Sequence, residues 1–291
     1  MRLCPEPLTD RLSFSLDHCV LSTAPWKARA EVVVDRPLET VWKAWSRLDR
    51  LTAWYAPSAA GDLHQGSQLI LQWADLDVAV KLDVETVRAP HEFALAANLG
   101  TYRQQQSVRL EGHGQKTHVE VIHQGGVDHF LKSGTEAGWR TQLKMLRLYL
   151  ETYAGEARAY VAEKYAIEAP PDSGFAYLVS PQLLASWLGE PSAPITTRGQ
   201  TLELKIGSLR YHTVVLNLEE PHEIALHFPL QQAVLRCRQI PLDRRDAGVK
   251  MLVIELSCWG NNDHRSKALL EAIGGASARL ANRIGVRLGC A

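Results

Sequence analysis

The sequence predicts an α+β fold built from two tandem copies of one domain, each a curved antiparallel sheet wrapped around a long C-terminal helix. The first observation behind this prediction is an internal repeat: Leu51-Thr52-Ala53-Trp54 recurs as Leu184-Ala185-Ser186-Trp187, 133 positions later. A repeat of that length corresponds to a whole domain rather than to a solenoid unit. The second observation is the order of elements, because each copy predicts a strand, two short helices, a run of strands and a final long helix. The length of 291 residues also favours two domains.

Two further matches support the repeat. Gly66 and Gly199 are related by the same offset, and Pro90-His91-Glu92 recurs as Pro221-His222-Glu223 at an offset of 131. A slip of two residues is one that a loop can absorb. We interpret both triplets as turns between strands, where proline fixes the backbone and the flanking polar residues face water, rather than as an acid–base pair.

The first copy, predicted over residues 27–154, begins with a strand and two helices. Residues 30–34 are short and rich in valine, which favours a strand. Asp35 is the predicted N-cap of the first helix, because proline and an acidic residue follow it in the first turn. A second short helix is predicted over residues 49–55.

After these helices the hydrophobic period changes from 3.6 to 2. Leu69, Leu71 and Trp73 alternate with the residues between them, which indicates a strand with one buried face. The predicted strands of this copy cover residues 68–73, 80–85, 93–97, 102–110 and 118–123. The copy ends in an amphipathic helix over residues 135–153, which carries Trp139 in its apolar stripe.

The second copy, predicted over residues 155–291, repeats this order with weaker signals. Two short helices end at Leu188, and the final helix covers residues 265–284. Strands are predicted over residues 160–167, 201–206, 211–218, 223–228, 233–240 and 249–258. Residues 1–26 have no counterpart in the repeat and form a predicted N-terminal extension, either an additional edge strand or a disordered arm.

The composition is that of an ordinary globular protein. Lys plus Arg equals Asp plus Glu at 32 each, so the charge gives no reason to expect nucleic acid or an anionic membrane as a partner. The five cysteines are scattered and show no C-x-x-C spacing, which is typical of reduced thiols. No stretch approaches the ~20 apolar residues of a membrane span, and Pro5, Glu6 and Asp10 interrupt the region where a signal peptide would need an apolar core. We therefore expect a cytoplasmic protein.

No catalytic or cofactor motif is present in the sequence. The phosphate-binding loop, the dinucleotide fingerprint, the nucleophile elbow and the His-Glu-x-x-His motif are all absent. His113, His118, His123 and His129 are predicted to lie on separate strands and loops, without the spacing that a zinc site needs. We expect neither a metal nor another cofactor.

The segment from Val34 to Trp42, which contains Pro37, resembles a helix start of the START-like (SRPBCC, helix-grip) superfamily. Trp54 and the pair Gly138-Trp139 at the opening of the long helix fit the same resemblance, which is closest to the subgroup homologous to the activator of the 90-kDa heat-shock protein ATPase. The second copy departs from the pattern, because Gly174-Phe175 stands where the first copy has Val-Trp. The resemblance implies a cavity under the long helix that takes an apolar small molecule, lipid- or polyketide-like in character, without implying a reaction.

Sheet parity predicts which side chains line such a cavity in the first copy. If Trp73 faces inward, alternate residues of the neighbouring strands should do so too. The candidate ligand-binding residues are Trp54, Trp73, Tyr102, Gln104, His123 and Trp139. The competing interpretation is that Trp54 and Trp139 are ordinary core residues, whereas an inward imidazole at His123 needs a partner or a ligand. The inward set of the second copy is aliphatic, so we expect the larger cavity in the first copy.

Three functions are consistent with these observations. The first is a non-enzymatic protein that binds an apolar small molecule in the cavity of the first copy. The second is a protein-interaction module that regulates a chaperone. The third is an enzyme similar to polyketide cyclases and dehydratases, for which His123 is the only acid–base candidate and lacks a visible orienting carboxylate. We therefore expect binding rather than catalysis.

Overall fold

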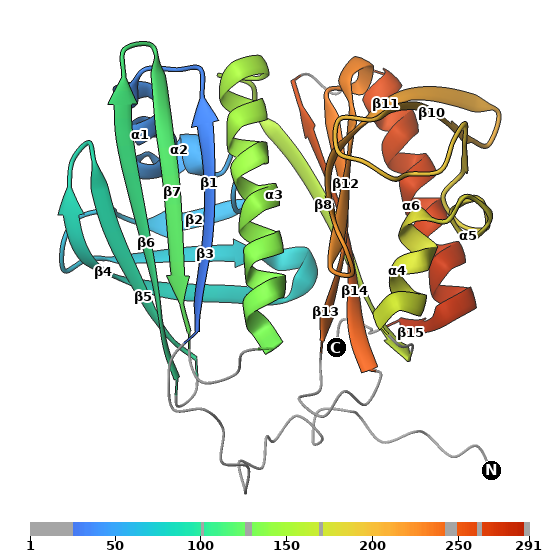
Figure 1. The fold of residues 1–291 in the computed structure, drawn as a ribbon, viewed down its shortest axis with the longest axis horizontal. Helices are drawn as coiled ribbons and strands as arrows, with labels where there is room; N and C mark the ends of the chain where they lie inside the picture. Colours follow the sequence, from blue (N-terminus) through green and yellow to red (C-terminus); the bar gives the residue numbers. More distant parts are fainter. Residues whose placement is uncertain are drawn as a thin grey trace, which may run out of the picture.

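The computed structural model describes residues 26–99, 102–125, 130–168, 171–241, 249–260 and 264–287. It contains two separate antiparallel sheets with the same strand order (Figure 1). The first has the order β1-β7-β6-β5-β4-β3-β2, and the second has the order β15-β8-β14-β13-β12-β11-β10-β9. The prediction of two tandem helix-grip domains is confirmed. The predicted N-terminal extension lies outside the described residues, except for Trp26, which is 2% exposed and packs against domain 1.

Domain 1 contains the first sheet and the long helix α3. Its strands are β1 (Lys27–Val34), β2 (Ser58–Gly61), β3 (Gln68–Trp73), β4 (Val78–Arg88), β5 (Glu92–Leu99), β6 (Tyr102–His113) and β7 (Lys116–Gln124). Its helices are α1 (Leu38–Ser46), α2 (Leu48–Leu51), the short 3₁₀ helix η2 (Ala74–Leu76) and α3 (Phe130–Thr152).

Domain 2 repeats this order and adds one short strand after its final helix. Its strands are β8 (Arg158–Glu168), β9 (Glu190–Pro191), β10 (Thr201–Ile206), β11 (Leu209–Glu219), β12 (Glu223–Phe228), β13 (Ala233–Pro241), β14 (Val249–Trp259) and β15 (Gly285–Arg287). Its helices are α4 (Pro171–Val179), α5 (Pro181–Ala185), the short 3₁₀ helix η3 (Pro229–Gln231) and α6 (His264–Ile284).

The two repeated tryptophans occupy equivalent positions. The indole N–H of Trp54 donates to the carbonyl of Ala44 at 3.0 Å. The indole N–H of Trp187 donates to the carbonyl of Tyr177 at 2.8 Å, also ten residues earlier in the chain. Each indole ties the segment after the second short helix to the first helix, which confirms the alignment of the two copies.

The two repeated glycines are also equivalent. Gly66 and Gly199 have φ values of 84° and 78°, in the left-handed region that favours glycine. Their backbone N–H groups donate to the carbonyls of Val84 and Val215, both at 2.8 Å. Each glycine therefore makes the same turn before the third strand of its sheet.

One local prediction was wrong. Asp35 does not cap the first helix, which begins at Leu38 with Pro37 at the N-cap position and no side-chain cap. The backbone N–H of Asp35 instead donates to Glu151 at 2.7 Å, near the end of α3. The carboxylate of Asp35 pairs with Lys116 at 3.0 Å, so this residue ties β1 to its neighbours rather than starting the helix.

Helix α3 lies between the two sheets, while α4 and α6 cover the opposite face of the second sheet (Figure 1). The core of domain 1 includes Ala225, Val234 and Trp259 from the second sheet. The indole N–H of Trp259 donates to the carbonyl of Ala53 at 2.7 Å, and its ring stacks on Tyr153 at 5.0 Å between centroids. The second sheet is thus covered on both faces around β12, where the sequence alone indicated one buried face.

Candidate functional site

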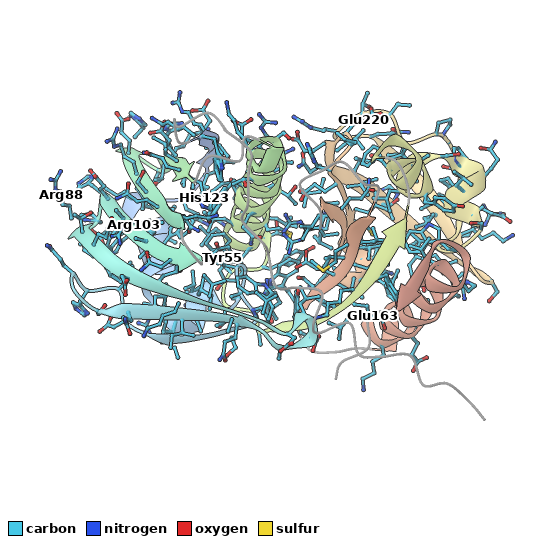
Figure 2. All side chains as sticks on the ribbon, turned by 90° about the horizontal axis from the view of Figure 1, so that it is seen from below. Tyr55, Arg88, Arg103, His123, Glu163 and Glu220 are labelled. Carbon is cyan, nitrogen blue, oxygen red and sulfur yellow. The ribbon has the colours of Figure 1, made fainter. Side chains whose placement is uncertain are left out.

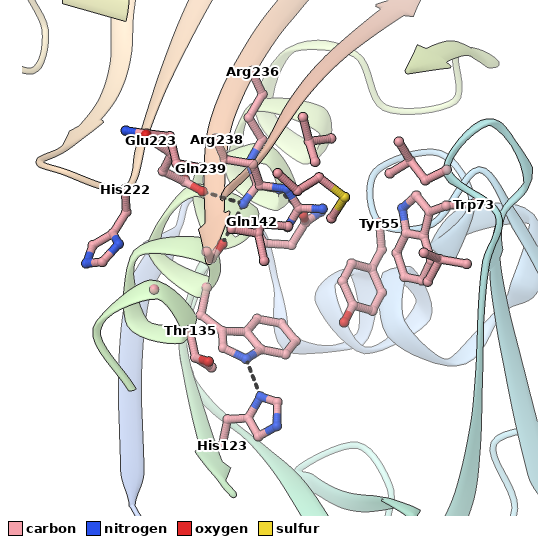
Figure 3. Close-up of a pocket in the computed structure, with 18 of the residues that line it drawn as sticks. Tyr55, Trp73, His123, Thr135, Gln142, His222, Glu223, Arg236, Arg238 and Gln239 are labelled. Atoms are coloured by element: carbon pink, nitrogen blue, oxygen red, sulfur yellow. Dashed lines mark hydrogen bonds and ion pairs between the residues drawn. The ribbon is translucent and has the colours of Figure 1, made fainter. Parts of the chain in front are cut away.

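A cavity of about 390 Å³ opens at the junction of the two domains (Figure 3). Domain 1 contributes the side chains of Tyr55, Trp73, Leu76, Val78, Gln106, His123, Thr135, Trp139 and Gln142. Domain 2 contributes the side chains of His222, Glu223, Arg236, Arg238, Gln239, Ile240, Met251 and Val253. The expectation of a cavity enclosed by domain 1 alone is corrected, because the outer face of the second sheet forms one wall.

The apolar wall is built from aromatic rings on β3, on α3 and on the segment between α2 and β2. The ring of Tyr55 lies 6.0 Å from Trp73 at an interplanar angle of 88°, and 5.7 Å from Trp139 at 30°. Trp73 ends β3 and Trp139 lies on α3, so these contacts join the sheet to the helix. Tyr55 and His123 both lie near α3 when the molecule is viewed from below (Figure 2). This wall suits a planar or aliphatic body rather than a charged one.

His123 is held by two hydrogen bonds to the protein. The indole N–H of Trp139 donates to its Nδ1 at 3.1 Å, and its Nε2 lies 3.0 Å from Oε1 of Gln104. An indole nitrogen can only donate, so Nδ1 must be unprotonated and Nε2 must carry the proton. Burial also lowers the pKa of His123 from 6.5 to about 4. The imidazole is therefore neutral and both of its nitrogens are engaged.

The polar wall comes from the outer face of the second sheet. Nη2 of Arg236 donates to Oε2 of Glu223 at 2.8 Å, and its Nη1 lies 3.7 Å from Glu255. Glu255 also pairs with Arg238 at 3.2 Å and accepts from the hydroxyl of Tyr160 at 2.8 Å. Burial raises the pKa of Glu223 above its ordinary range, against the opposing effect of Arg236. These charges are compensated mainly by each other, as buried ions require.

The same cluster ties domain 2 to helix α3. Nη2 of Arg236 also donates to the carbonyl of Gly138 at 3.3 Å, and its Nη1 donates to Oε1 of Gln142 at 3.3 Å. The amide of Gln142 in turn donates to the backbone carbonyl of Trp54 at 2.7 Å. A chain of hydrogen bonds therefore runs from the second sheet, across the cavity wall, into the core of domain 1.

A second polar contact between the domains lies further along α3. The amide of Asn217 donates to the hydroxyl of Thr141 at 2.6 Å and accepts from Lys144 at 2.6 Å. Arg140 pairs with Glu219 at 2.9 Å. Burial lowers the pKa of Lys144 to about 8. The junction is therefore held by specific hydrogen bonds as well as by apolar packing.

The structure brings together three of the six predicted site residues at the cavity. Trp73, His123 and Trp139 line it, and Gln104 contacts His123 from behind. Trp54 is fully buried and does not line the cavity, as the core interpretation predicted. Tyr102 starts β6, but its side chain is outside what the structure describes.

Sequence reasoning missed the residues that domain 2 contributes. His222 and Glu223 were expected to face water in a turn, and that expectation was wrong for Glu223, which is 2% exposed. The equivalent Glu92 in domain 1 keeps 30% of its side chain exposed. The difference arises because domain 1 covers the outer face of the second sheet. Charged residues within otherwise apolar strands, such as Arg236 and Glu255, were the available signal.

In the part of the chain that the structure describes, no group of three or more His, Cys, Asp or Glu side chains could hold a metal ion. Across the same residues, no helix combines the length and the apolar character that crossing a membrane would take.

Comparison with known proteins gives one family match and several structural similarities. The family model described as "Activator of Hsp90 ATPase homolog 1-like protein" matches residues 35–151, within domain 1. A search of curated protein sequences returns no significant match.

Three of the similar solved structures illustrate the range of these similarities. The di-domain ARO/CYC BexL from the BE-7585A biosynthetic pathway is 14% identical, with a TM-score of 0.41, and covers 88% of this chain and 94% of its own. DynU16, described as a putative protein in the dynemicin biosynthetic locus, is 17% identical, with a TM-score of 0.39. The match covers 88% of this chain and 96% of DynU16. The Aha1 dimer from Colwellia psychrerythraea is 17% identical, with a TM-score of 0.39. The match covers 45% of this chain and 99% of the Aha1 chain.

Proposed function

We propose, from the match of residues 35–151 to the Activator of Hsp90 ATPase homolog 1-like family model and from the cavity described above, that the chain is a non-enzymatic binding protein for an apolar small molecule. The binding site is the cavity at the domain junction. Its volume of about 390 Å³ falls within the range of small-molecule sites. The observation that carries the proposal is the pairing of an aromatic wall with a small set of converging polar groups.

The chemistry of the wall supports binding over catalysis. General acid–base catalysis needs a group that can exchange a proton near neutral pH. His123, the one acid–base candidate from the sequence, is held neutral by Trp139 and Gln104, and its pKa of about 4 lies far below neutrality. Its role is to fix the indole that forms the cavity wall.

Titration with the fluorescent apolar probe N-phenyl-1-naphthylamine tests the proposal. Val78 lines the cavity and is 39% exposed, so Val78→Trp should occupy part of the cavity from its exposed side without disturbing the core. Val33 is a matched control, because it is 46% exposed on β1 and does not line the cavity. We expect Val78→Trp to weaken probe binding at least tenfold and Val33→Trp to leave it unchanged. Equal binding by both variants would show that the probe sits elsewhere.

A protein partner is the second candidate, and the family match is the observation that favours it. The surface of the described residues gives less support to a protein partner. The large exposed apolar residues are spread over separate elements, namely Val33, Val78, Val161, Leu209 and Leu230. Protein-binding surfaces more often show a contiguous apolar patch. The outer face of α3 and that of the second sheet are already used in the contact between domains.

A further inference from the structure

One carboxylate oxygen in the cavity wall, Oε1 of Glu223, has no hydrogen-bond partner within the described part of the chain. Glu223 is 2% exposed, and its Oε2 accepts from Arg236 at 2.8 Å. Its Oε1 is buried and finds no hydrogen-bond donor among the residues that the structure describes. Glu223 lines the cavity beside His222 and Gln239 (Figure 3).

Such an oxygen points to a ligand. Buried polar groups in folded proteins are nearly always hydrogen-bonded, and an exception requires a specific explanation. The two oxygens of Glu223 suggest such an explanation. The guanidinium of Arg236 donates to Oε2 and leaves Oε1 as an acceptor. A molecule in the cavity that carries a hydrogen-bond donor at one end would complete the pair.

The surrounding charges decide which kind of donor fits. The cluster pairs the guanidinium groups of Arg236 and Arg238 with the carboxylates of Glu223 and Glu255, so its charges balance. Because the guanidinium of Arg236 lies 2.8 Å from Glu223, a cationic ammonium group at this end of the cavity would meet a buried positive charge. An anionic group would meet the free oxygen of Glu223. A neutral hydroxyl avoids both conflicts and can donate directly.

We propose that the occupant of this cavity is a neutral molecule with a planar apolar body and a terminal hydroxyl that donates to Oε1 of Glu223. The inference rests on the proposed binding function and deepens it by naming the class of ligand. The apolar body lies against Tyr55, Trp73 and Trp139, and the hydroxyl lies at the wall contributed by domain 2. Domain 1 thus supplies the apolar surface and domain 2 supplies the polar specificity.

Two probes of nearly equal shape test the donor. Calorimetric titration at neutral pH compares 2-naphthol, which carries a hydroxyl donor, with 2-methoxynaphthalene, which does not. We expect the native protein to bind 2-naphthol about tenfold more tightly, a difference that corresponds to one good hydrogen bond. The cationic 2-naphthylmethylamine should bind more weakly than 2-naphthol.

Substitution of the acceptor completes the test. In Glu223→Gln the amide oxygen should face Arg236 and the NH₂ group should face the cavity, so the preference for 2-naphthol should vanish or reverse. Glu220→Gln is the matched control, because Glu220 is exposed in the preceding turn and should keep the preference. The two naphthalenes differ in size by the same methyl group in every variant, so the effect of size cancels when their affinity ratios are compared between variants.

The outcomes separate this inference from the proposed function. If Val78→Trp abolishes probe binding but the native protein binds the two naphthalenes equally well, only the hydroxyl assignment is overturned. A preference for 2-naphthol that survives in Glu223→Gln also overturns it, as does tighter binding of the ammonium probe. Failure of the native protein to bind any of the three probes contradicts both proposals.

Discussion

The two nitrogens of His123 are both engaged by the protein, and this gives the residue a measurable structural role. Replacing it in His123→Leu leaves the indole N–H of Trp139 without its acceptor in a buried site. We expect the free energy of unfolding to fall by about 1–3 kcal/mol in urea denaturation. His113→Leu is the control, since the side chain of His113 is 61% exposed. An unchanged stability in His123→Leu would contradict the hydrogen bond from Trp139.

Buried histidines also predict how stability depends on pH. Burial lowers the pKa of His123 and of His227 from 6.5 to about 4, and His227 lies 2.8 Å from the hydroxyl of Tyr153. Between about pH 4 and pH 6.5 these histidines bind protons in the unfolded chain but not in the folded chain. The free energy of unfolding therefore falls as the pH falls from 6.5 to about 4. We expect a loss of up to about 3 kcal/mol from His123 alone. Thermal denaturation across this range should show it, with a flatter profile in His123→Leu.

At the scale of single elements, helix α3 depends on a polar contact with the second sheet. The amide of Asn217 serves both Thr141 and Lys144, and Asn217 and Thr141 are fully buried. In Asn217→Ala both partners lose their hydrogen bond, which should lower the free energy of unfolding by about 2 kcal/mol. Asn98→Ala on β5 changes an exposed asparagine and should have little effect. Similar stabilities for the two variants would contradict this account of the contact.

The elements themselves followed closely from the sequence. The strand predicted over residues 233–240 is observed as Ala233–Pro241, and the final helix predicted over 265–284 is observed as His264–Ile284. Local sequence carries enough hydrophobic pattern in these segments to predict their bounds, although the signals of the second copy are weaker than those of the first. The edge strands β2 and β9 were missed because they are short and carry no such pattern. Their pairing depends on neighbours that come later in the chain.

The candidate site was harder to predict for a physical reason. Strand alternation identifies which residues share a face, and it placed His123 on the inner face of the first sheet, where its side chain is buried. Alternation does not say what covers the outer face of a second sheet. The burial of Glu223 and Arg236 follows from the docking of one domain on the other, which no local pattern records.

At the scale of the whole molecule, the two domains should unfold together. The core of domain 1 extends into domain 2, because Ala225, Val234 and Trp259 from the second sheet belong to it. Unfolding either domain would expose this apolar surface and break the hydrogen bonds of Arg236, so neither domain should persist alone. We expect a single transition in differential scanning calorimetry, with equal calorimetric and van't Hoff enthalpies. Two resolved transitions would show that the domains are independent.

The position of α3 between two sheets gives the two copies unequal tolerance to amino-acid change. Buried residues on α3 point in several directions, namely Ala137, Trp139, Thr141, Gln142, Leu143, Met145, Leu146, Tyr149 and Leu150. Among the α6 residues whose side chains the structure describes, the buried set is Leu269, Ile273, Ala276 and Leu280, at intervals of three or four residues. After a duplication, the helix of the first copy must therefore pack against two sheets, while the helix of the second copy packs against one. Substitutions should accumulate around much of the circumference of α6 and be restricted over most of α3.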